Sequence, residues 1–261
     1  MKPVHDKIIK ELRAFAKETG VKKFVLGLSG GLDSAVVAVL AARAVGHKNV
    51  YAAALPTKYN AAQSLTSAKK LAKNLGINFD VINISPVFES AKEEFKKSKF
   101  KKLKPLTEQN FQPRIRAMML MALSAETGGV VLCCANKSEI YAGYSTLYGD
   151  TCGAVAPLAQ LYKTEVYELA EYINKDKEII PSFIITRPPS AELAAGQKDS
   201  DDIPEYAILD GIYRSIIDKG LTEKETAKKT GVSIKIIKDV MARKKRNAFK
   251  CAQSAPPLRI K

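Results

Sequence analysis

The sequence predicts an α/β fold, a doubly wound parallel sheet with extra helices at the C-terminal end. Short apolar runs typical of buried strands alternate with longer segments of helical period through the first half of the chain. A glycine turn, Ser29-Gly-Gly-Leu-Asp-Ser34, joins the first run to the next helix, as in a βα unit. After residue 205 only helical patterns remain. The alternation indicates parallel strands covered on both faces by helices.

The elements follow in order from apolar periodicity and turn residues. Apolar residues share one stripe of residues 7–18, which predicts an amphipathic first helix, and the β-branched run 22–28 predicts the first strand. The alanine-rich residues 35–45 predict the helix after the glycine turn. Later strands are predicted at 50–55, 79–84 and 130–134. Later helices are predicted at 61–75, 86–97, 110–127, 206–219, 223–230 and 234–246.

Two polar segments interrupt this alternation. Residues 96–113 are lysine-rich and residues 185–204 are irregular, and long irregular segments in a compact fold are usually functional or disordered. We therefore expect both to be lids over a site. The three methionines of the helix predicted at 110–127, which are Met118, Met119 and Met121, are expected in the core.

Composition limits the class of protein. The 261 residues are 46% hydrophobic, which suits one domain, residues 1–261, with residues 205–250 as its C-terminal helical portion. No run reaches the length of a membrane span and no signal peptide is visible, so a cytoplasmic protein without membrane contact is expected. The four cysteines, of which Cys133 and Cys134 are adjacent, and the two histidines show no zinc spacing. The net charge of +15 suits nucleic acid or a polyphosphate substrate.

The glycine turn carries the most specific chemistry. It lacks the Gly-Lys-Ser/Thr ending of Walker loops and the Gly-x-Gly-x-x-Gly dinucleotide pattern. A strand, a glycine turn and a helix N-terminus together bind phosphate through backbone amides, and Asp33 there is explained by a divalent metal between acid and phosphate. An acid without a lysine suits adenylation, in which pyrophosphate must be held as it leaves.

A second polar cluster, Asn136-Lys-Ser-Glu139, follows the fourth predicted strand. The Glu139 carboxylate is either a second metal ligand or an ordinary first-turn acid favoured by the helix dipole. Arg114 and Arg116 begin a helix and can grip a phosphate or a carboxylate. Lys163 opens another helix, where a cation is unfavourable without an anionic partner.

Together these segments resemble the NAD synthetases, ligases of the N-type ATP pyrophosphatase group. The matching pieces run in order through nearly the whole chain. They are Ser29-Gly-Gly-Leu-Asp-Ser34, Asn110-Phe-Gln-Pro-Arg-Ile-Arg116, Asn136-Lys-Ser-Glu139, Thr146-Leu-Tyr-Gly-Asp150, Leu161-Tyr-Lys-Thr-Glu-Val-Tyr-Glu-Leu-Ala170, Pro189-Ser-Ala-Glu-Leu193 and Asn247-Ala-Phe-Lys250. The first is shared by the wider group and the later ones are specific to NAD synthetases.

The resemblance implies a Rossmann-like fold and a reaction. The nicotinate carboxylate of deamido-NAD attacks ATP, giving an adenylated intermediate and pyrophosphate, and ammonia then displaces AMP to leave NAD. It implies a homodimer, with the dinucleotide bound near the subunit interface. The matched motifs begin near residue 25, which leaves no room before them for an amidohydrolase domain, so ammonia is the expected donor. A separate glutaminase subunit stays open.

The resemblance also implies roles for individual residues. Asp33, Glu139 and Lys163 are the expected catalytic residues, and the two acids are the expected ligands of Mg²⁺. Arg114 is expected to contact deamido-NAD. The expected ATP-binding residues are Gly27, Leu28, Ser29, Gly30, Gly31, Leu32, Asp33, Ser34, Cys134, Lys163 and Ser190.

This chain departs from the family pattern at three places. Cys133-Cys134 stands where relatives often have Gly-Thr or Thr-Thr, and a thiol is a poorer hydrogen-bond donor than the threonine hydroxyl that contacts ATP. Leu147 and Ala154 stand where some ammonia-dependent members use Lys and Asp toward deamido-NAD. The Thr-Leu-Tyr-Gly-Asp form belongs to another branch of the family.

Two rival functions remain. One is another N-type pyrophosphatase, such as a tRNA-modifying enzyme, which the positive charge and the Cys133-Cys134 pair favour. The other is a nucleic-acid-binding module, since residues 221–246 read like helix-turn-helix with Gly231 in the turn. We expect that segment to be a helical hairpin packed on the core or on a second subunit, and nucleic acid not to be a partner.

Overall fold

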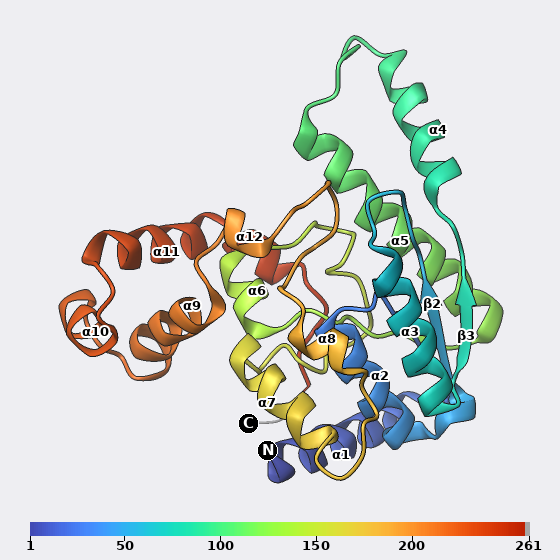
Figure 1. Cartoon of the computed structure of the whole chain (residues 1–261), viewed down its shortest axis with the longest axis horizontal. Helices are drawn as coiled ribbons and strands as arrows, with labels where there is room; N and C mark the ends of the chain where they lie inside the picture. Colours follow the sequence, from blue (N-terminus) through green and yellow to red (C-terminus); the bar gives the residue numbers. More distant parts are fainter. Residues whose placement is uncertain (259–261) are drawn as a thin grey trace.

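A computed structural model describes residues 1–258 of the chain. At its centre is a parallel sheet of four strands in the order β3-β2-β1-β4 (Figure 1). The strands are β1 (Phe24–Gly27), β2 (Val50–Ala54), β3 (Asn78–Val81) and β4 (Val130–Val131). The register pairs Phe24 with Val50 on one side and with Val130 on the other. The predicted parallel α/β sheet is confirmed.

Helices cover both faces of this sheet. The helices of the α/β part are α1 (Lys2–Thr19), α2 (Leu32–Val45), α3 (Ala62–Leu75), α4 (Ser85–Lys96), α5 (Pro105–Thr127), α6 (Lys137–Ala142), α7 (Lys163–Ile173) and α8 (Ser182–Thr186). Successive strand residues point to opposite faces, so Ala52 belongs to the cluster with α1 and α2 while Ala53 belongs to the cluster with α4 and α5. A 3₁₀ turn, η1 (His47–Asn49), precedes β2. The sheet is therefore doubly wound.

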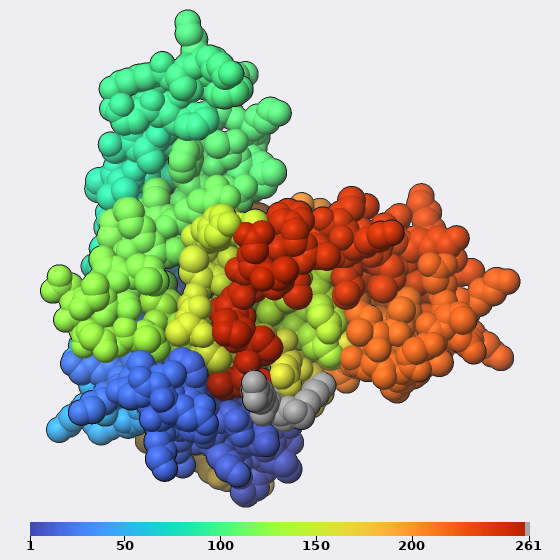
Figure 2. Space-filling model, turned by 180° about the vertical axis from the view of Figure 1, so that it is seen from behind, coloured from blue at the N-terminus to red at the C-terminus, as the bar shows by residue number. Residues whose placement is uncertain are grey.

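The C-terminal helices project from one side of this body (Figure 1). They are α9 (Tyr206–Tyr213), the π-helical turn η3 (Arg214–Asp218), α10 (Glu223–Thr230), α11 (Ile234–Arg246) and α12 (Ala248–Ala252). Helices α9 to α11 share a hydrophobic cluster with Ala142 of α6 and with Tyr162, and in it Ile237 and Val240 of α11 pack with Tyr213. The hairpin of α10 and α11 thus packs on α9. After α12 the chain returns across the back of the α/β part (Figure 2), where Ala156 forms a bridge with Pro257.

Several predicted boundaries are wrong. The helix expected at 110–127 begins at Pro105, because proline suits the first turn of a helix. The polar residues of this first part of the helix hide the apolar period in the sequence. The strand expected at 130–134 is regular only over β4, although Leu132 continues as an isolated bridge to Val155. The strand expected at 79–84 is β3, which ends at Val81 and is mostly exposed as an edge strand. The helix expected at 206–219 changes to π geometry after Tyr213.

The methionine prediction is also wrong for two of three residues. Met118 and Met121 are 52% and 54% exposed, whereas Met119 packs against the cluster of α4 and α5. Helical period explains the difference, since Ile115 and Met119 lie four residues apart on the inner face and the other two point outward. No helix in residues 1–258 combines the length and the apolar character needed to cross a membrane.

Candidate active site

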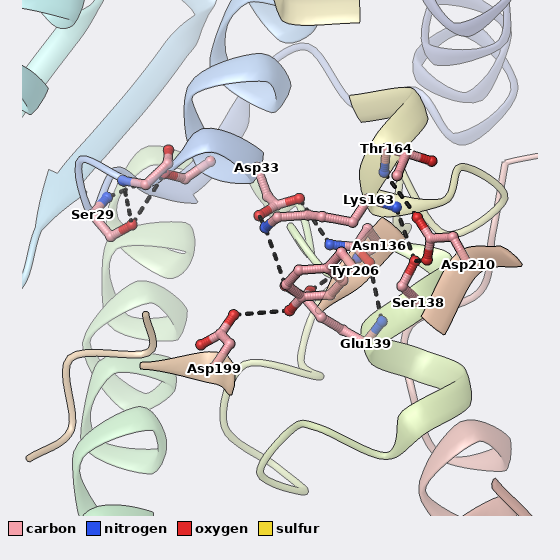
Figure 3. A network of polar contacts seen from close by, with 12 residues as sticks. Ser29, Asp33, Asn136, Ser138, Glu139, Lys163, Thr164, Asp199, Tyr206 and Asp210 are labelled. Carbon is pink, nitrogen blue, oxygen red and sulfur yellow. Dashed lines mark hydrogen bonds and ion pairs between the residues drawn. The ribbon is translucent and has the colours of Figure 1, made fainter. Parts of the chain in front are cut away.

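The glycine turn between β1 and α2 is braced by its own side chains (Figure 3). Ser29 Oγ accepts a hydrogen bond from the Gly31 amide at 3.1 Å, and Ser34 Oγ donates to the Gly31 carbonyl at 3.0 Å. Gly30 has a φ of +81°, and a Cβ there would lie 2.2 Å from the carbonyl oxygen of Ser64, so only glycine fits. The N-cap of α2 is Gly31, which has no side chain to cap the first turn. That turn can therefore receive an anion.

The turn lies at the carboxyl end of the central strands. Gly27 is the last residue of β1, and the Leu28 amide still donates to the Ala53 carbonyl of β2 at 2.8 Å. Leu32 is buried at the start of α2. Ligands of open parallel sheets bind at this edge, so the phosphate-binding interpretation of the turn agrees with its place in the fold.

Three charged side chains from distant parts of the sequence meet beside the turn (Figure 3). The Lys163 ammonium of α7 is ion-paired with Asp33 of α2 and lies 3.5 Å from Glu139 Oε1 of α6. Asn136 Nδ2 donates to Asp33 Oδ1 at 2.9 Å. The Lys163 side chain is only 5% exposed, so its ammonium group is shielded from water and contacts two carboxylates. The structure thus brings together the three predicted catalytic residues.

The electrostatics of the cluster follow from this proximity. Burial by itself would lower the pKa of Lys163, but the charges of Asp33 and Glu139 outweigh burial and hold the pKa above its ordinary value. Burial, and then the nearby Asp33 carboxylate, raise the pKa of Glu139 to about 8. Two carboxylates thus share one cation, and the pair retains capacity for another positive charge.

Polar contacts fix α6 and α7 in this arrangement. Asn136 caps α6, accepting from the Glu139 amide at 3.0 Å while Glu139 Oε2 accepts from the Asn136 amide at 3.2 Å. Ser138 Oγ is hydrogen-bonded to the buried carboxylate of Asp210 and accepts from the Lys163 amide at 2.9 Å. Asp210 Oδ2 also accepts from the Thr164 amide at 2.9 Å. The carboxylate of α9 therefore ties together the starts of the two helices that supply Glu139 and Lys163.

The irregular segment 185–204 also reaches the site. Asp199, in the 3₁₀ turn η2 (Asp199–Asp201), accepts from the Tyr206 hydroxyl at 2.8 Å, and the Lys163 ammonium lies 5.2 Å from the centre of the Tyr206 ring. Asp199 Oδ1 is buried with no hydrogen-bond partner in the described part of the chain. Among residues 1–258, the other predicted lid, residues 96–113, has no contact of this kind with the site. Its residues 97–104 form the tip of the hairpin of α4 and α5, which projects from the body (Figure 1).

The two predicted arginines have different environments. Arg116 is partly buried, donating to the Leu55 carbonyl at 3.0 Å and to Asn60 Oδ1 at 3.1 Å, and loss of hydration lowers its pKa to about 10. Arg114 is exposed and donates through Nε to the Leu147 carbonyl at 3.1 Å. Arg116 is therefore part of the internal structure, whereas Arg114 can meet a ligand at the surface.

Two more of the expected ATP-binding residues are Cys134, which directly follows the Cys133 that ends the bridged strand region, and Ser190, which lies in the 185–204 segment. Burial raises the pKa of the Cys134 thiol well above its ordinary value, and the charges of Cys133, Asp33 and Glu139 add to the shift. Ser190 Oγ donates to the Gln197 carbonyl at 2.5 Å, within the 185–204 segment. The raised pKa of Cys134 and the hydrogen bond of Ser190 do not bear on ATP binding, so the ATP-binding roles expected of these two residues stay predictions.

Sequence reasoning missed Asp199, Tyr206 and Asp210. Asp210 had a signal, because it is the one acid in an otherwise apolar helical segment, Tyr206–Tyr213. Such an acid is buried only when it is paired or hydrogen-bonded. Asp199 had no signal in the sequence, because it begins a run of similar acids that continues with Asp201 and Asp202. Only the structure shows that Asp199 is buried and the other two are exposed.

Comparison with known proteins agrees with this geometry. The family model described as NAD synthase matches residues 4–254. A glutamine-dependent NAD(+) synthetase of Thermotoga maritima is 42% identical over 255 residues, covering 97% of this chain and 44% of that protein. One of Synechocystis is 38% identical, covering 94% and 44%. The chain thus spans less than half the length of these curated relatives.

Solved structures show the same fold. The NMN synthetase of Francisella tularensis has a TM-score of 0.82 and 29% identity, covering 96% of this chain and 95% of that one. The NH3-dependent NAD synthetase of Campylobacter jejuni has a TM-score of 0.76 and 29% identity, with 95% of each chain covered. The Rossmann-like fold and the resemblance found in the motifs are confirmed, and the chain belongs to the NAD synthase family.

Proposed function

We propose that this chain is the synthetase that converts deamido-NAD to NAD, consuming ATP and ammonia and releasing AMP and pyrophosphate. The observation that carries the proposal is the meeting of Asp33, Glu139 and Lys163 beside the uncapped N-terminus of α2. A group that must stabilise departing pyrophosphate needs backbone amides and positive charge in one place. This edge of the sheet supplies both.

In the first step an oxygen of the nicotinate carboxylate attacks the α-phosphorus of ATP. A bond forms between that oxygen and phosphorus, and the bond from phosphorus to the pyrophosphate oxygen breaks. The amides from Gly30 to Ser34 hold the phosphates, and the Lys163 ammonium offsets part of the negative charge that develops. Arg114 orients the deamido-NAD carboxylate or phosphates from the surface.

In the second step the ammonia nitrogen attacks the carbonyl carbon of the adenylated nicotinate. The carbon–nitrogen bond forms, the carbon–oxygen bond breaks with its electron pair passing to the phosphate oxygen of AMP, and the nitrogen releases one proton to water. Ammonia is the species that reacts at this site. The curated relatives, of which this chain covers less than half the length, are named glutamine-dependent, so the proposal assigns the chain the ammonia-consuming step and not the origin of the ammonia.

We infer that Mg²⁺ accompanies ATP at Asp33 and Glu139. No three His, Cys, Asp or Glu residues among the described ones are arranged to hold a metal ion. The donor set nevertheless fits magnesium, which proteins bind through one or two carboxylates completed by substrate phosphates. When bound, the ion would neutralise phosphate charge.

The proposed dimer is supported by the exposed apolar residues of α5. Met118 and Met121 lie three residues apart on one helix and are both more than half exposed, and neighbouring exposed apolar side chains are typical of an interface. The family resemblance implies the same assembly. A cytoplasmic location stays a prediction from composition.

One assay tests the function. The protein is incubated with ATP, MgCl₂, deamido-NAD and either ammonium chloride or glutamine, and NAD, AMP and pyrophosphate are measured. Formation of all three products in equal amounts with ammonium supports the proposal. Nicotinate mononucleotide is tested in parallel, because the Francisella tularensis neighbour is named an NMN synthetase. AMP formation that requires tRNA and not deamido-NAD would contradict the proposal.

A further inference from the structure

Glu192 has an unusual backbone conformation. Its φ is +49°, and among residues 1–258 only Tyr148 is another non-glycine residue with positive φ. A side chain in this region costs free energy, which other contacts must offset. The Glu192 side chain is 12% exposed, so these contacts lie inside the protein. The strain marks a place where the fold specifies the position of one carboxylate.

Four groups hold that carboxylate. Arg187 donates to Glu192 Oε1 at 2.8 Å, and Ser64 Oγ donates to the same oxygen at 2.9 Å. Asn60 Nδ2 donates to Oε2 at 3.0 Å, and the Ala61 amide lies 3.5 Å from Oε1. Three of these groups lie about 130 residues earlier in the chain, Asn60 and Ala61 just before α3 and Ser64 in its first turn. The carboxylate therefore joins the 185–204 segment to the start of α3.

This carboxylate takes the place of a cap on α3. The N-cap residue of α3 is Ala61, which has no side-chain cap, and the first turn of α3 carries no acid of its own. A negative charge at a helix N-terminus is stabilising because it offsets the helix dipole. Glu192 supplies that charge from a different part of the chain, and in doing so it fixes Ser64.

Ser64 is the contact between this network and the phosphate-binding turn. The Ser64 carbonyl packs so closely on Gly30 that a Cβ on the glycine would overlap it. On its other side, the Glu192 amide donates to Ser190 Oγ at 3.1 Å. The Glu192 carboxylate thus fixes the surface on which the phosphate-binding turn rests, and the Glu192 backbone amide holds the serine expected to contact ATP.

We propose that Glu192 is a positioning residue for ATP, acting through Ser64 on the glycine turn and through Ser190 on the nucleotide. The inference rests on the proposed use of ATP at this site. It does not require Glu192 to contact the substrate. It accounts for a glutamate at a position of positive φ, where glycine would relieve the strain. Its loss loosens the nucleotide site first and leaves the Arg114 surface in place.

The chain offers a matched control on the same helix. Lys70 of α3 is ion-paired with Glu178 at 2.8 Å, and both side chains are about half exposed. This pair also links α3 to a distant segment, but it contacts neither Ser64 nor the glycine turn. Glu178→Gln removes an exposed ion pair, which is worth little, and ATP binding should stay at the wild-type value.

The experiment measures ATP binding by calorimetric titration of the full chain with MgCl₂, using Glu192→Ala, Glu192→Gly, Glu192→Gln and Glu178→Gln. We expect roughly tenfold weaker binding or more for Glu192→Ala and Glu192→Gly, and an intermediate loss for Glu192→Gln, which keeps an acceptor oxygen. In turnover, the KM for ATP should rise while the KM for deamido-NAD changes little. Glu192→Gly should unfold at a higher temperature than Glu192→Ala, because glycine tolerates the positive φ.

The outcomes separate this proposal from the proposed function. ATP binding within twofold of wild type in Glu192→Gln and in any folded Ala or Gly variant overturns the positioning role. An equal rise in both KM values also overturns it, since that indicates a general structural defect. If wild type binds ATP but forms no NAD, the proposed function fails while the titrations still decide the role of Glu192. If wild type binds no ATP, both fail.

Discussion

The ammonium group of Lys163 is ion-paired with the carboxylate of Asp33, which stands 130 residues earlier in the chain. The same ammonium also faces Glu139, so one cation is shared by two carboxylates at the edge of the sheet. A lysine at the start of a helix is unfavourable on its own. Here the carboxylates of Asp33 and Glu139 stabilise the Lys163 ammonium at the start of α7.

Asp33→Ala should abolish adenylation and leave the fold intact. The carboxylate is lost from the proposed magnesium site and from the neighbourhood of the phosphates, so single-turnover pyrophosphate formation should fall by at least about 100-fold. Asp80→Ala, on the exposed edge strand β3, serves as the control. A pyrophosphate burst near the wild-type rate in a folded Asp33→Ala protein would contradict the metal role.

Lys163→Met should lower both activity and stability. The substitution leaves Asp33 and Glu139 facing each other in a partly buried place without the cation, which is costly. We expect loss of NAD formation and a fall of several degrees in the unfolding temperature. Lys70→Met removes an exposed ion pair on α3 and should change neither. An unchanged unfolding temperature for Lys163→Met would show that the ion pairs contribute little to the fold.

Arg114→Ala should raise the KM for deamido-NAD more than the KM for ATP. Its guanidinium is exposed, and its one described bond is to the Leu147 carbonyl, so truncation should leave the unfolding temperature unchanged. Arg116→Ala should behave differently, lowering stability by about 1–3 kcal/mol because two partly buried hydrogen bonds of a charged group are lost. Equal effects of Arg114→Ala on both KM values would assign Arg114 a structural role only.

Stability should fall at high pH because of Cys133. Burial raises its pKa from 9.0 to about 12, so the unfolded chain ionises this thiol at a lower pH than the folded chain does. Its contribution is present below pH 9.0 and is lost as the pH rises toward about 12. Denaturant titrations across this range should show a shallower pH dependence for Cys133→Ala. An unchanged slope would mean that the thiol ionises equally in both states.

Met118→Glu combined with Met121→Glu should yield a monomer. These side chains lie on the exposed face of α5, and two charges there oppose burial against a second copy. Sedimentation velocity measures the change. Ile208→Glu on α9, where the side chain is 38% exposed, is the matched control and should leave the assembly intact. A wild-type monomer would contradict the proposed dimer.

The sequence predicted most of the α/β order because each element there has a clear apolar period. Its errors fall where the period is hidden, as at the polar start of α5, or where exposure depends on which helix face meets the sheet, as for Met118 and Met121. The segment 185–204 was identified as unusual, but nothing local indicated that Glu192 takes a positive φ or that Asp199 pairs with Tyr206.

By itself the sequence determined the glycine turn, its place between strand and helix, and the residue types of the site. Local geometry explains this, since a phosphate-binding turn needs glycine at Gly30 and a helix directly after it. Only the tertiary structure decided which charges meet. The parallel sheet brings the carboxyl ends of separate strands to one edge, so Asp33, Glu139 and Lys163 become neighbours although no local pattern joins them.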